Sequence, residues 1–219
     1  DTVVQVNSQR ITAAQLLLRM EGEGVAAQPH PWLPDCLVLS GTGNLEQLPS
    51  FREGLFYVQD AAAKLSVLCA QLPANENWKV LDCCAAPGGK SFAAAIAMGG
   101  KGYITSCDIH SHKALLIEKG AARLGIDRLQ ALEQDASQRN PLWVGQMDVV
   151  IADVPCSGYG IIRKKPDIRY KSLAEAAQLP ALQQEIINNA ARYVKPGGLL
   201  LYSTCTLTRQ ENEGRVEEF

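Results

Sequence analysis

The sequence predicts an α/β domain whose mainly parallel β-sheet is covered by helices on both faces. From residue 79 onward, short apolar runs alternate with longer amphipathic segments, which is the pattern of repeated strand–helix units. The first run leads into a tight turn of small residues, which favours a strand followed closely by a helix. An aspartate ends or closely follows four of the runs, and these are Asp82, Asp108, Asp135 and Asp153. Ligands of such sheets bind at the carboxyl ends of the strands, so the four carboxylates are predicted to lie at one site.

Residues 1–50 are expected to form a small α+β linker region ahead of the main domain, which takes residues 51–219. The pattern predicts a short strand over 3–6 and a helix over 12–20 that glycines close. A proline-rich connector is expected to follow, through residues 29–34. Nothing in this region of the sequence points to a chemical function.

A turn and a short aromatic strand lead into a helix that we predict over residues 60–69. Asp60 stands at its start, where a carboxylate can accept a hydrogen bond from a free backbone N–H group. We therefore predict that Asp60 is the N-cap. A capped helix explains this stretch without any further function.

The main domain is predicted to alternate strands and helices along the chain. The expected strands are 79–81, 102–107, 129–133, 148–152 and 199–202. The expected helices are 89–98, 111–124 with Ser111 as N-cap, 181–194, and one that begins near Thr208. Gly125 and the glycines at 197 and 198 supply the stops, because glycine readily ends a helix or turns the chain.

Size and composition limit the classes of protein to which this chain can belong. Its 219 residues suffice for one α/β domain with a modest addition, and 47% hydrophobic residues indicate a globular core. A net charge of -2 argues against a strongly basic nucleic-acid protein, so any RNA contact must come from a local patch. The sequence holds no apolar run of membrane-spanning length, and its first residues lack the features of a signal peptide. We expect a cytoplasmic monomer without a membrane partner.

The cysteines and histidines do not follow the spacing of a metal site. The seven cysteines form no C-x-x-C pair, and the three histidines do not complete a ligand set. We therefore expect no metal. Most of the cysteines are expected to be small buried hydrophobes, so a catalytic role for any of them must follow from its neighbours.

The turn over residues 84–90 has the composition of a ligand-binding loop. Gly88 and Gly89 carry no side chain that would hold a ligand away, and the N–H groups that open the next helix are free to meet it. A P-loop would need a glycine where Cys84 stands, and the sequence has no G-x-G-x-x-G fingerprint. A nucleoside ligand without a pyrophosphate remains, with an ordinary strand-to-helix turn as the plain alternative.

A basic segment follows the fourth strand of the main domain. Between residues 160 and 171 the basic side chains are Arg163, Lys164, Lys165, Arg169 and Lys171, against the single acid Asp167. Tyr159 and Tyr170 flank them and could stack on unpaired bases. The segment is therefore a candidate for RNA contact, and a solvated loop is the alternative.

Three strings together resemble the RNA 5-methylcytosine methyltransferases of the NOL1/NOP2/Sun family. They are DCCAAPGGK at 82–90, Asp-Val-Pro-Cys-Ser at 153–157 and Ser-Thr-Cys-Thr at 203–206. The family pattern has alanine where this chain has Val154 and serine where it has Thr206. The continuation over 160–168 resembles the Sun (RsmB-like) subgroup. Relative to that subgroup, the chain looks like a fragment without the N-terminal NusB-like domain and the C-terminal strands.

The resemblance implies a Rossmann-like fold that binds S-adenosylmethionine. The residues that it assigns to the cofactor are Cys84, Ala85, Ala86, Pro87, Gly88, Gly89, Lys90, Asp108, Asp135 and Asp153. Asp108 would accept hydrogen bonds from the ribose hydroxyls, and Asp135 would lie near the adenine amino group. The resemblance also implies that Gln59 forms part of the wall of the pocket. The RNA would contact Arg163, Lys164, Lys165 and Arg169.

The implied reaction transfers a methyl group to carbon 5 of a cytosine in RNA, most simply the small-subunit (16S) ribosomal RNA. Carbon 5 becomes nucleophilic only after a thiolate has added to carbon 6. By resemblance the nucleophile is Cys205, and Cys156 assists release of the product. Asp153 would hydrogen-bond the base. The thiolate would be favoured by the nearby Lys90, by a cluster of backbone N–H groups or by the cationic cofactor.

Two alternatives stay open at this point. A DNA cytosine-5 methyltransferase would use Cys156 as the nucleophile, but the second cysteine, Cys205, speaks against it. A nucleic-acid-binding scaffold without catalysis is the other alternative. The intact Asp153, Cys156 and Cys205 argue against such a scaffold.

Overall fold

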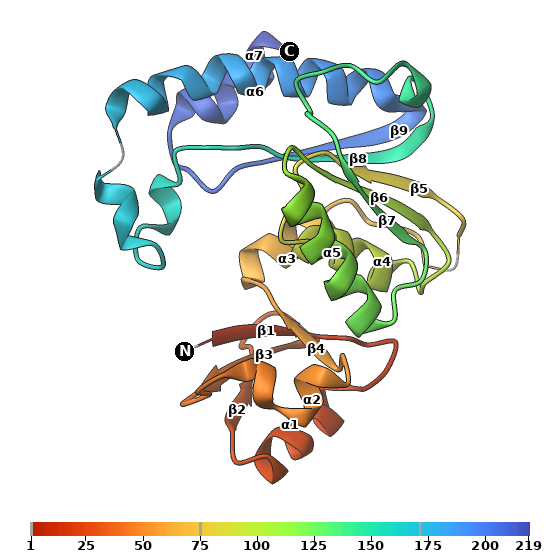
Figure 1. Ribbon diagram of the computed structural model, residues 1–219, viewed down its shortest axis with the longest axis vertical. Helices are drawn as coiled ribbons and strands as arrows, with labels where there is room; N and C mark the ends of the chain where they lie inside the picture. The colour runs from red at the N-terminus through yellow and green to blue at the C-terminus, as the bar shows by residue number, and fades with distance from the viewer. Residues whose placement is uncertain (1, 75, 171) are drawn as a thin grey trace.

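The computed structural model describes residues 2–74, 76–170 and 172–219, and these form two β-sheets (Figure 1). The smaller sheet has the order β2-β3-β1-β4, and its strand pairs are antiparallel. The larger sheet has the order β7-β6-β5-β8-β9, and all of its strand pairs are parallel. The predicted α/β class with a parallel sheet is confirmed.

The smaller sheet belongs to the N-terminal region. Its strands are β1 (Thr2–Val6), β2 (Ala26–Pro29), β3 (Cys36–Ser40) and β4 (Phe56–Val58). Helix α1 (Ala13–Gly22) begins after the N-cap Thr12, which forms a capping box with Gln15. A 3₁₀ turn (Leu45–Gln47) and the short helix α2 (Pro49–Arg52) complete the region.

Two predictions for this region differ from the structure. The expected proline-rich connector is wrong, because β2 and β3 form a hairpin there: Pro29 ends β2 and pairs with Leu37, and Pro31 and Pro34 lie at the bend. Residues 36–40 pair with both β1 and β2, and these long-range pairings are invisible to local patterns. The sheet also continues past residue 50, where we expected the main domain to begin, because β4 pairs with β1.

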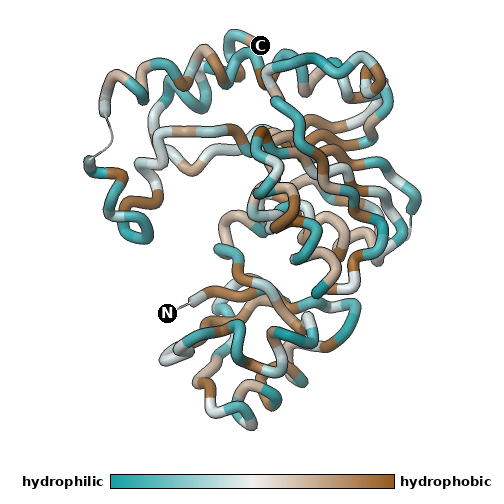
Figure 2. Tube along the Cα trace, in the orientation of Figure 1, coloured by the Kyte–Doolittle hydropathy of each residue, from teal (hydrophilic) through white to brown (hydrophobic). Residues whose placement is uncertain are grey.

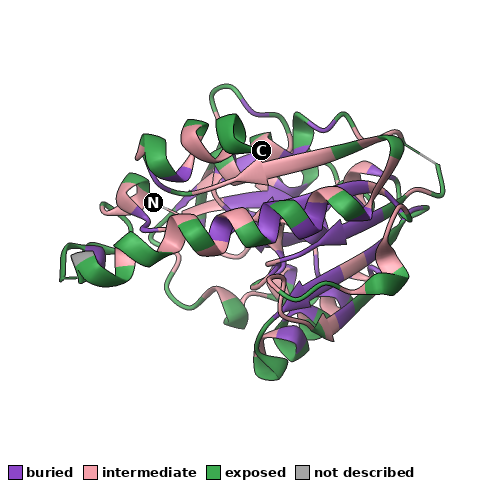
Figure 3. Ribbon diagram, turned by 90° about the horizontal axis from the view of Figure 1, so that it is seen from above, coloured by how far each residue is buried: buried purple, intermediate pink, exposed green. Residues whose placement is uncertain are grey.

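The strands of the larger sheet agree with the predicted ranges to within a few residues, except β9, which begins earlier. They are β5 (Lys79–Asp82), β6 (Tyr103–Asp108), β7 (Leu129–Glu133), β8 (Met147–Asp153) and β9 (Val194–Ser203). Residues 149–152 of β8 are fully buried, as expected for a strand covered on both faces. Figure 3 shows this buried sheet between helices whose outer faces are exposed.

Helices cover both faces of the larger sheet. On one face lie α3 (Ala61–Leu68), α4 (Gly89–Ala97) and α5 (Ser111–Leu124), whose side chains join those of β5, β6 and β8 in one cluster. On the other face lies α6 (Leu173–Tyr193), which packs on β5 and β8. Figure 2 shows the hydrophobic residues concentrated along the strands of the sheet. None of the helices described is long and apolar enough to cross a membrane.

The helix boundaries test the predicted caps. Asp60 is the N-cap of α3, as predicted, and its side chain accepts a hydrogen bond from the N–H of Ala62 at 2.9 Å. The predicted N-cap Ser111 is wrong, because it is already the first residue of α5 and His110 is the cap. Helix α6 begins at residue 173 and runs through Pro180, where we expected it to begin only after the proline.

The end of the described chain folds back along α6. A 3₁₀ turn (Arg209–Glu211) follows Thr208, and α7 (Glu213–Glu218) follows it, in agreement with the helix expected from near Thr208. Strand β9 is an edge strand of the sheet as described.

Candidate active site

A cleft of about 730 Å³ opens at the carboxyl ends of β5, β8 and β9. The predicted site residues that line it are Cys84, Ala85, Ala86, Pro87, Gly89, Lys90, Asp153, Arg163, Lys164, Lys165 and Cys205, together with Gln59. The first residues of α3 form its opposite wall. The lining does not include Gly88, Asp108, Asp135, Cys156 or Arg169. The sheet edge therefore gathers most of the predicted residues, as the strand-end carboxylates indicated.

Backbone conformation explains the two glycines of the 84–90 loop. Gly88 is the N-cap of α4 with φ 105°, a conformation that favours glycine, and a Cβ there would lie 2.5 Å from the ring of Phe92. A Cβ on Gly89 would lie 3.0 Å from the side-chain amide of Gln59. The N–H of Ala85 donates to the carbonyl of Cys107 at 2.7 Å and ties the loop to β6. The loop is thus held with its backbone against the cleft.

Asp82 is a buried carboxylate beneath this loop. Its Oδ2 accepts a hydrogen bond from Ser91 at 2.7 Å, and Ser91 accepts one from Ser106 at 2.7 Å. Its Oδ1 is buried and has no hydrogen-bond partner among the described residues. Burial raises the pKa of Asp82 to about 7, against the opposing effect of the Ser91 hydrogen bond. Asp82 was not among the assigned site residues, although it is one of the four strand-end acids.

The two candidate catalytic cysteines lie in contact. The sulfurs of Cys156 and Cys205 are 3.0 Å apart, both thiols are free, and the backbone N–H of Cys205 lies 3.2 Å from the sulfur of Cys156. They meet because Asp153 pairs with Ser203 at the ends of the adjacent parallel strands β8 and β9. Cys205 is exposed toward the cleft and Cys156 is partly buried.

The contact makes the two thiols unequal. A hydrogen bond from Cys156 lowers the pKa of Cys205 to about 7, with a smaller lowering from Lys165, while burial and the charge of Asp153 act in the opposite direction. The same hydrogen bond and burial raise the pKa of Cys156 well above its ordinary value. Cys205 is therefore the thiol with the larger thiolate fraction at neutral pH.

Asp153 lies beside this pair with both carboxylate oxygens engaged. Its Oδ2 forms an ion pair with the ammonium of Lys90 at 2.7 Å, and its Oδ1 accepts a hydrogen bond from Ser203 at 2.8 Å. Lys90 thus contacts Asp153, whereas the cation that favours the thiolate of Cys205 is Lys165. Nothing in the sequence indicated which of these two lysines favours the thiolate of Cys205.

Asp108 and Asp135 lie farther along the same sheet edge, at the ends of β6 and β7. Asp108 Oδ1 accepts a hydrogen bond from the N–H of His110 at 3.0 Å. Asp135 Oδ1 accepts hydrogen bonds from the N–H and the hydroxyl of Ser137, at 2.9 and 2.8 Å. Each carboxylate thus orders its own turn through one oxygen, Oδ1.

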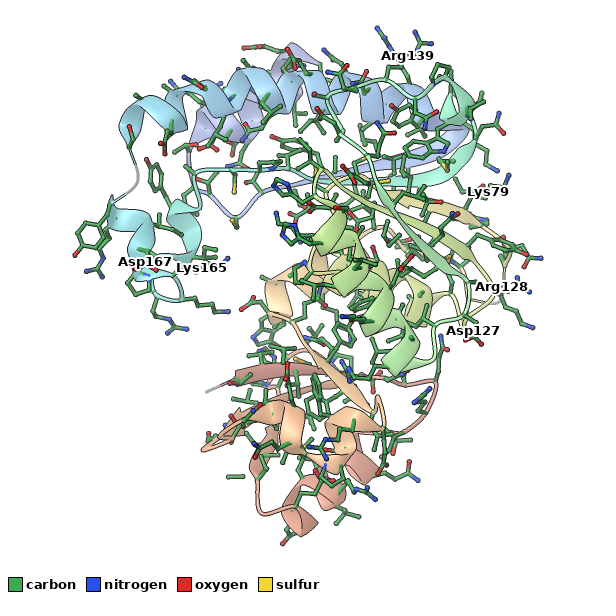
Figure 4. The ribbon with its side chains drawn as sticks, viewed as in Figure 1. Lys79, Asp127, Arg128, Arg139, Lys165 and Asp167 are labelled. Atoms are coloured by element: carbon green, nitrogen blue, oxygen red, sulfur yellow. The ribbon has the colours of Figure 1, made fainter. Side chains whose placement is uncertain are left out.

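The basic segment forms two 3₁₀ turns, Tyr159–Ile161 and Pro166–Tyr170, beside the cleft. Lys164 crosses the cleft to form an ion pair with Asp60 at the start of α3. Figure 4 shows Lys165 and Asp167 on this segment, on the opposite side of the molecule from Asp127 in this view. Lys171 lies outside the described residues.

Comparison with known proteins identifies a family for this chain. The family described as 16S rRNA methyltransferase RsmB/F matches residues 69–219. The probable ribosomal RNA small subunit methyltransferase B of Bacillus subtilis is 37% identical over 218 residues, which cover 99% of this chain and 48% of that protein. The chain thus spans about half the length of the curated relatives it matches.

Solved structures share the fold. The crystal structure of a methyltransferase homolog from Pyrococcus horikoshii superimposes with a TM-score of 0.81 at 27% identity, over 99% of this chain and 68% of that one. NSun6 from the same organism, 20% identical over 99% of this chain and 78% of that one, has a TM-score of 0.87 and supports the fold alone. The resemblance to the NOL1/NOP2/Sun group is confirmed. The match from residue 69 to the last residue shows that the chain belongs to the 16S rRNA methyltransferase RsmB/F family.

Proposed function

We propose that this protein transfers a methyl group from S-adenosylmethionine to carbon 5 of a cytosine in 16S ribosomal RNA. The reaction proceeds through a covalent bond between Cys205 and the base, in the cytoplasm. The observation that carries the proposal is the contact of two free thiols at 3.0 Å, beside the Lys90–Asp153 pair and in the cleft that the 84–90 loop lines.

The described residues fit the proposed cofactor. Asp82 lines the cleft, and its buried Oδ1 has no hydrogen-bond partner among the described residues. This oxygen could accept a hydrogen bond from the ammonium group of the methionine part of the cofactor. The 84–90 loop, Asp108 and Asp135 would hold the rest of the molecule. When bound, the cofactor supplies a methyl group activated by a positively charged sulfur.

The two cysteines have separate tasks in this proposal. Cys205, with a pKa of about 7, is substantially thiolate at neutral pH and adds to carbon 6 of the base. The electron pair of the carbon 5–carbon 6 bond then makes carbon 5 nucleophilic. Once carbon 5 carries the methyl group, a water molecule accepts the proton of carbon 5, and the electron pair of that C–H bond restores the double bond and expels Cys205 as a thiolate. Cys156 lies within 3.0 Å of the departing sulfur and assists this elimination.

The other groups of the cleft hold the base and the RNA. Asp153, oriented by Lys90 and Ser203, is placed to hydrogen-bond ring nitrogen 3 and the exocyclic amine of cytosine. Arg163, Lys164, Lys165 and Arg169 would contact phosphates of unpaired RNA, because arginine and lysine are the usual partners of the backbone. The lowered pKa of Cys205 rather than Cys156 favours this arrangement over that of a DNA enzyme.

A methyl-transfer assay tests the proposal. The intact protein, labelled S-adenosylmethionine and 16S ribosomal RNA from cells that lack the gene are incubated together, and the RNA is analysed for 5-methylcytosine. We expect label at one or a few cytosines and none in double-stranded DNA of the same sequence. Label in the DNA but not in the RNA would contradict the proposal.

The role of Asp108 predicts a specific loss of cofactor affinity. Asp108→Ala should weaken S-adenosylmethionine binding by about 1.5–3 kcal/mol, because hydrogen bonds to a charged group are lost. Isothermal titration calorimetry measures this. The matched control is Asp127→Ala, which removes an exposed aspartate at the opposite end of the sheet (Figure 4). Equal affinities for the two variants would rule out the assigned role.

A further inference from the structure

A buried carboxylate, Glu211, lies behind the two cysteines. It is 4% exposed and accepts four hydrogen bonds. The N–H and the hydroxyl of Ser157 donate to it at 2.9 and 2.6 Å, Gln183 donates at 2.9 Å and Thr208 at 2.8 Å. Burial alone would raise the pKa of Glu211, but these hydrogen bonds outweigh it and lower the pKa. Glu211 is therefore charged at neutral pH.

Glu211 reaches the loops of both cysteines. Ser157 directly follows Cys156, and its hydroxyl also lies 2.7 Å from that of Thr206, which directly follows Cys205. Gln183, another partner of the carboxylate, also donates to the carbonyl of Pro155 at 2.9 Å. The carboxylate is thus linked to the residue after Cys156 directly and to the residue after Cys205 through the hydroxyl of Ser157.

Asn212 fixes the other side of the Cys205 loop. Its Oδ1 accepts a hydrogen bond from Thr204 at 2.6 Å, and its Nδ2 donates to the carbonyls of Thr206 and Thr208 at 3.2 and 2.9 Å. The strand pairing of β8 with β9 ends at Asp153 and Ser203. Beyond that point the backbone N–H of Gly160 donates to the carbonyl of Cys205 at 3.0 Å, and side chains from the turn after β9 add hydrogen bonds to both cysteine loops.

We propose that Glu211 is a positioning residue that holds the thiol of Cys156 within hydrogen-bonding distance of Cys205 and thereby sets the reactivity of Cys205. This inference rests on the proposed role of Cys205 as nucleophile. Hydrogen bonds weaken steeply with distance and angle, so a small displacement of the Ser157 loop is enough to lose the contact between the sulfurs. Without that contact, Cys205 behaves as an ordinary thiol.

The negative charge of Glu211 and its positioning of Cys156 would have opposite effects on the pKa of Cys205. Removing a negative charge near a thiol favours the thiolate and lowers its pKa, whereas losing the hydrogen bond from Cys156 raises the pKa of Cys205. The sign of the change in Glu211→Gln therefore separates positioning from a direct effect of charge.

The test measures thiol reactivity in the absence of RNA and cofactor. The intact protein is treated with iodoacetamide between pH 5 and 10, and alkylation of Cys205 is followed by peptide mass spectrometry. In Glu211→Gln and in Ser157→Ala we expect the midpoint for Cys205 to rise from near 7 toward the value of about 8.5 for a free thiol, with roughly tenfold slower alkylation at pH 7. The control Glu213→Gln changes an exposed glutamate two residues away and should leave the midpoint unchanged.

Each outcome decides the proposal. An unchanged Cys205 midpoint in folded Glu211→Gln would mean that Glu211 has only a structural role. A lowered midpoint would mean that Glu211 acts on Cys205 through its charge. Either result overturns the positioning role. If Glu211→Gln does not fold, Ser157→Ala decides, because it removes the hydroxyl link and keeps the carboxylate. Alkylation needs no methyl transfer, so failure of the proposed function and failure of this inference remain distinguishable.

Discussion

Cys205→Ala should abolish methyl transfer, lowering turnover by about 10⁴-fold or more, because the step that makes carbon 5 nucleophilic requires the thiolate. The variant should also form no covalent complex with RNA. Affinity for S-adenosylmethionine should change little, because Cys205 lies just after β9 and not in the 84–90 loop. The measurement combines label transfer to 16S ribosomal RNA with denaturing electrophoresis of the reaction mixture.

Cys69→Ala is the matched control for this substitution. Cys69 is also an exposed, free cysteine, but it lies at the end of α3 and does not line the cleft. It should keep full activity. Substantial methylation of RNA by Cys205→Ala would mean that the nucleophile has been misassigned.

Cys156→Ala is expected to fail at a later step and to accumulate a protein–RNA adduct. Attack and elimination are distinct steps, and loss of a group that serves only the second leaves the intermediate stranded. The adduct should contain the methyl label and survive denaturing electrophoresis. Multiple-turnover product formation should fall far below that of the unsubstituted protein.

The contact between the sulfurs adds a pH dependence to this result. Without the hydrogen bond from Cys156, the pKa of Cys205 should rise from about 7 toward about 8.5, so the adduct should form roughly 25-fold more slowly at pH 7 than at pH 9. An adduct in Cys205→Ala and none in Cys156→Ala would reverse the two roles and favour the arrangement of a DNA enzyme.

Local patterns determined most of the fold. The apolar runs that became β5, β6, β7 and β8 were predictable because a buried strand needs a short continuous stretch of hydrophobic residues. The strand-end position of Asp82, Asp108 and Asp153 followed from the same runs, and parallel pairing brings such ends to one edge. The family of the chain could also be predicted from the sequence, because the family motifs are contiguous strings of residues.

The tertiary structure decided which of these residues touch. The sulfurs of Cys156 and Cys205 are 49 positions apart in the chain, Lys90 is 63 positions from Asp153, and Glu211 is 54 positions from Ser157. Strand and helix periodicity place residues on a face or at an edge but do not specify their distance from a residue on another element.

The same limit explains the parts of the fold that sequence patterns missed. The hairpin of β2 and β3 depends on pairing with β1, more than 30 residues away. The sequence by itself determined the fold class, the strand-end acids and the two candidate cysteines. Only the tertiary structure determined that Cys156 lowers the pKa of Cys205, that Lys90 pairs with Asp153 and that Glu211 connects both cysteine loops, because each of these depends on contacts between distant segments of the chain.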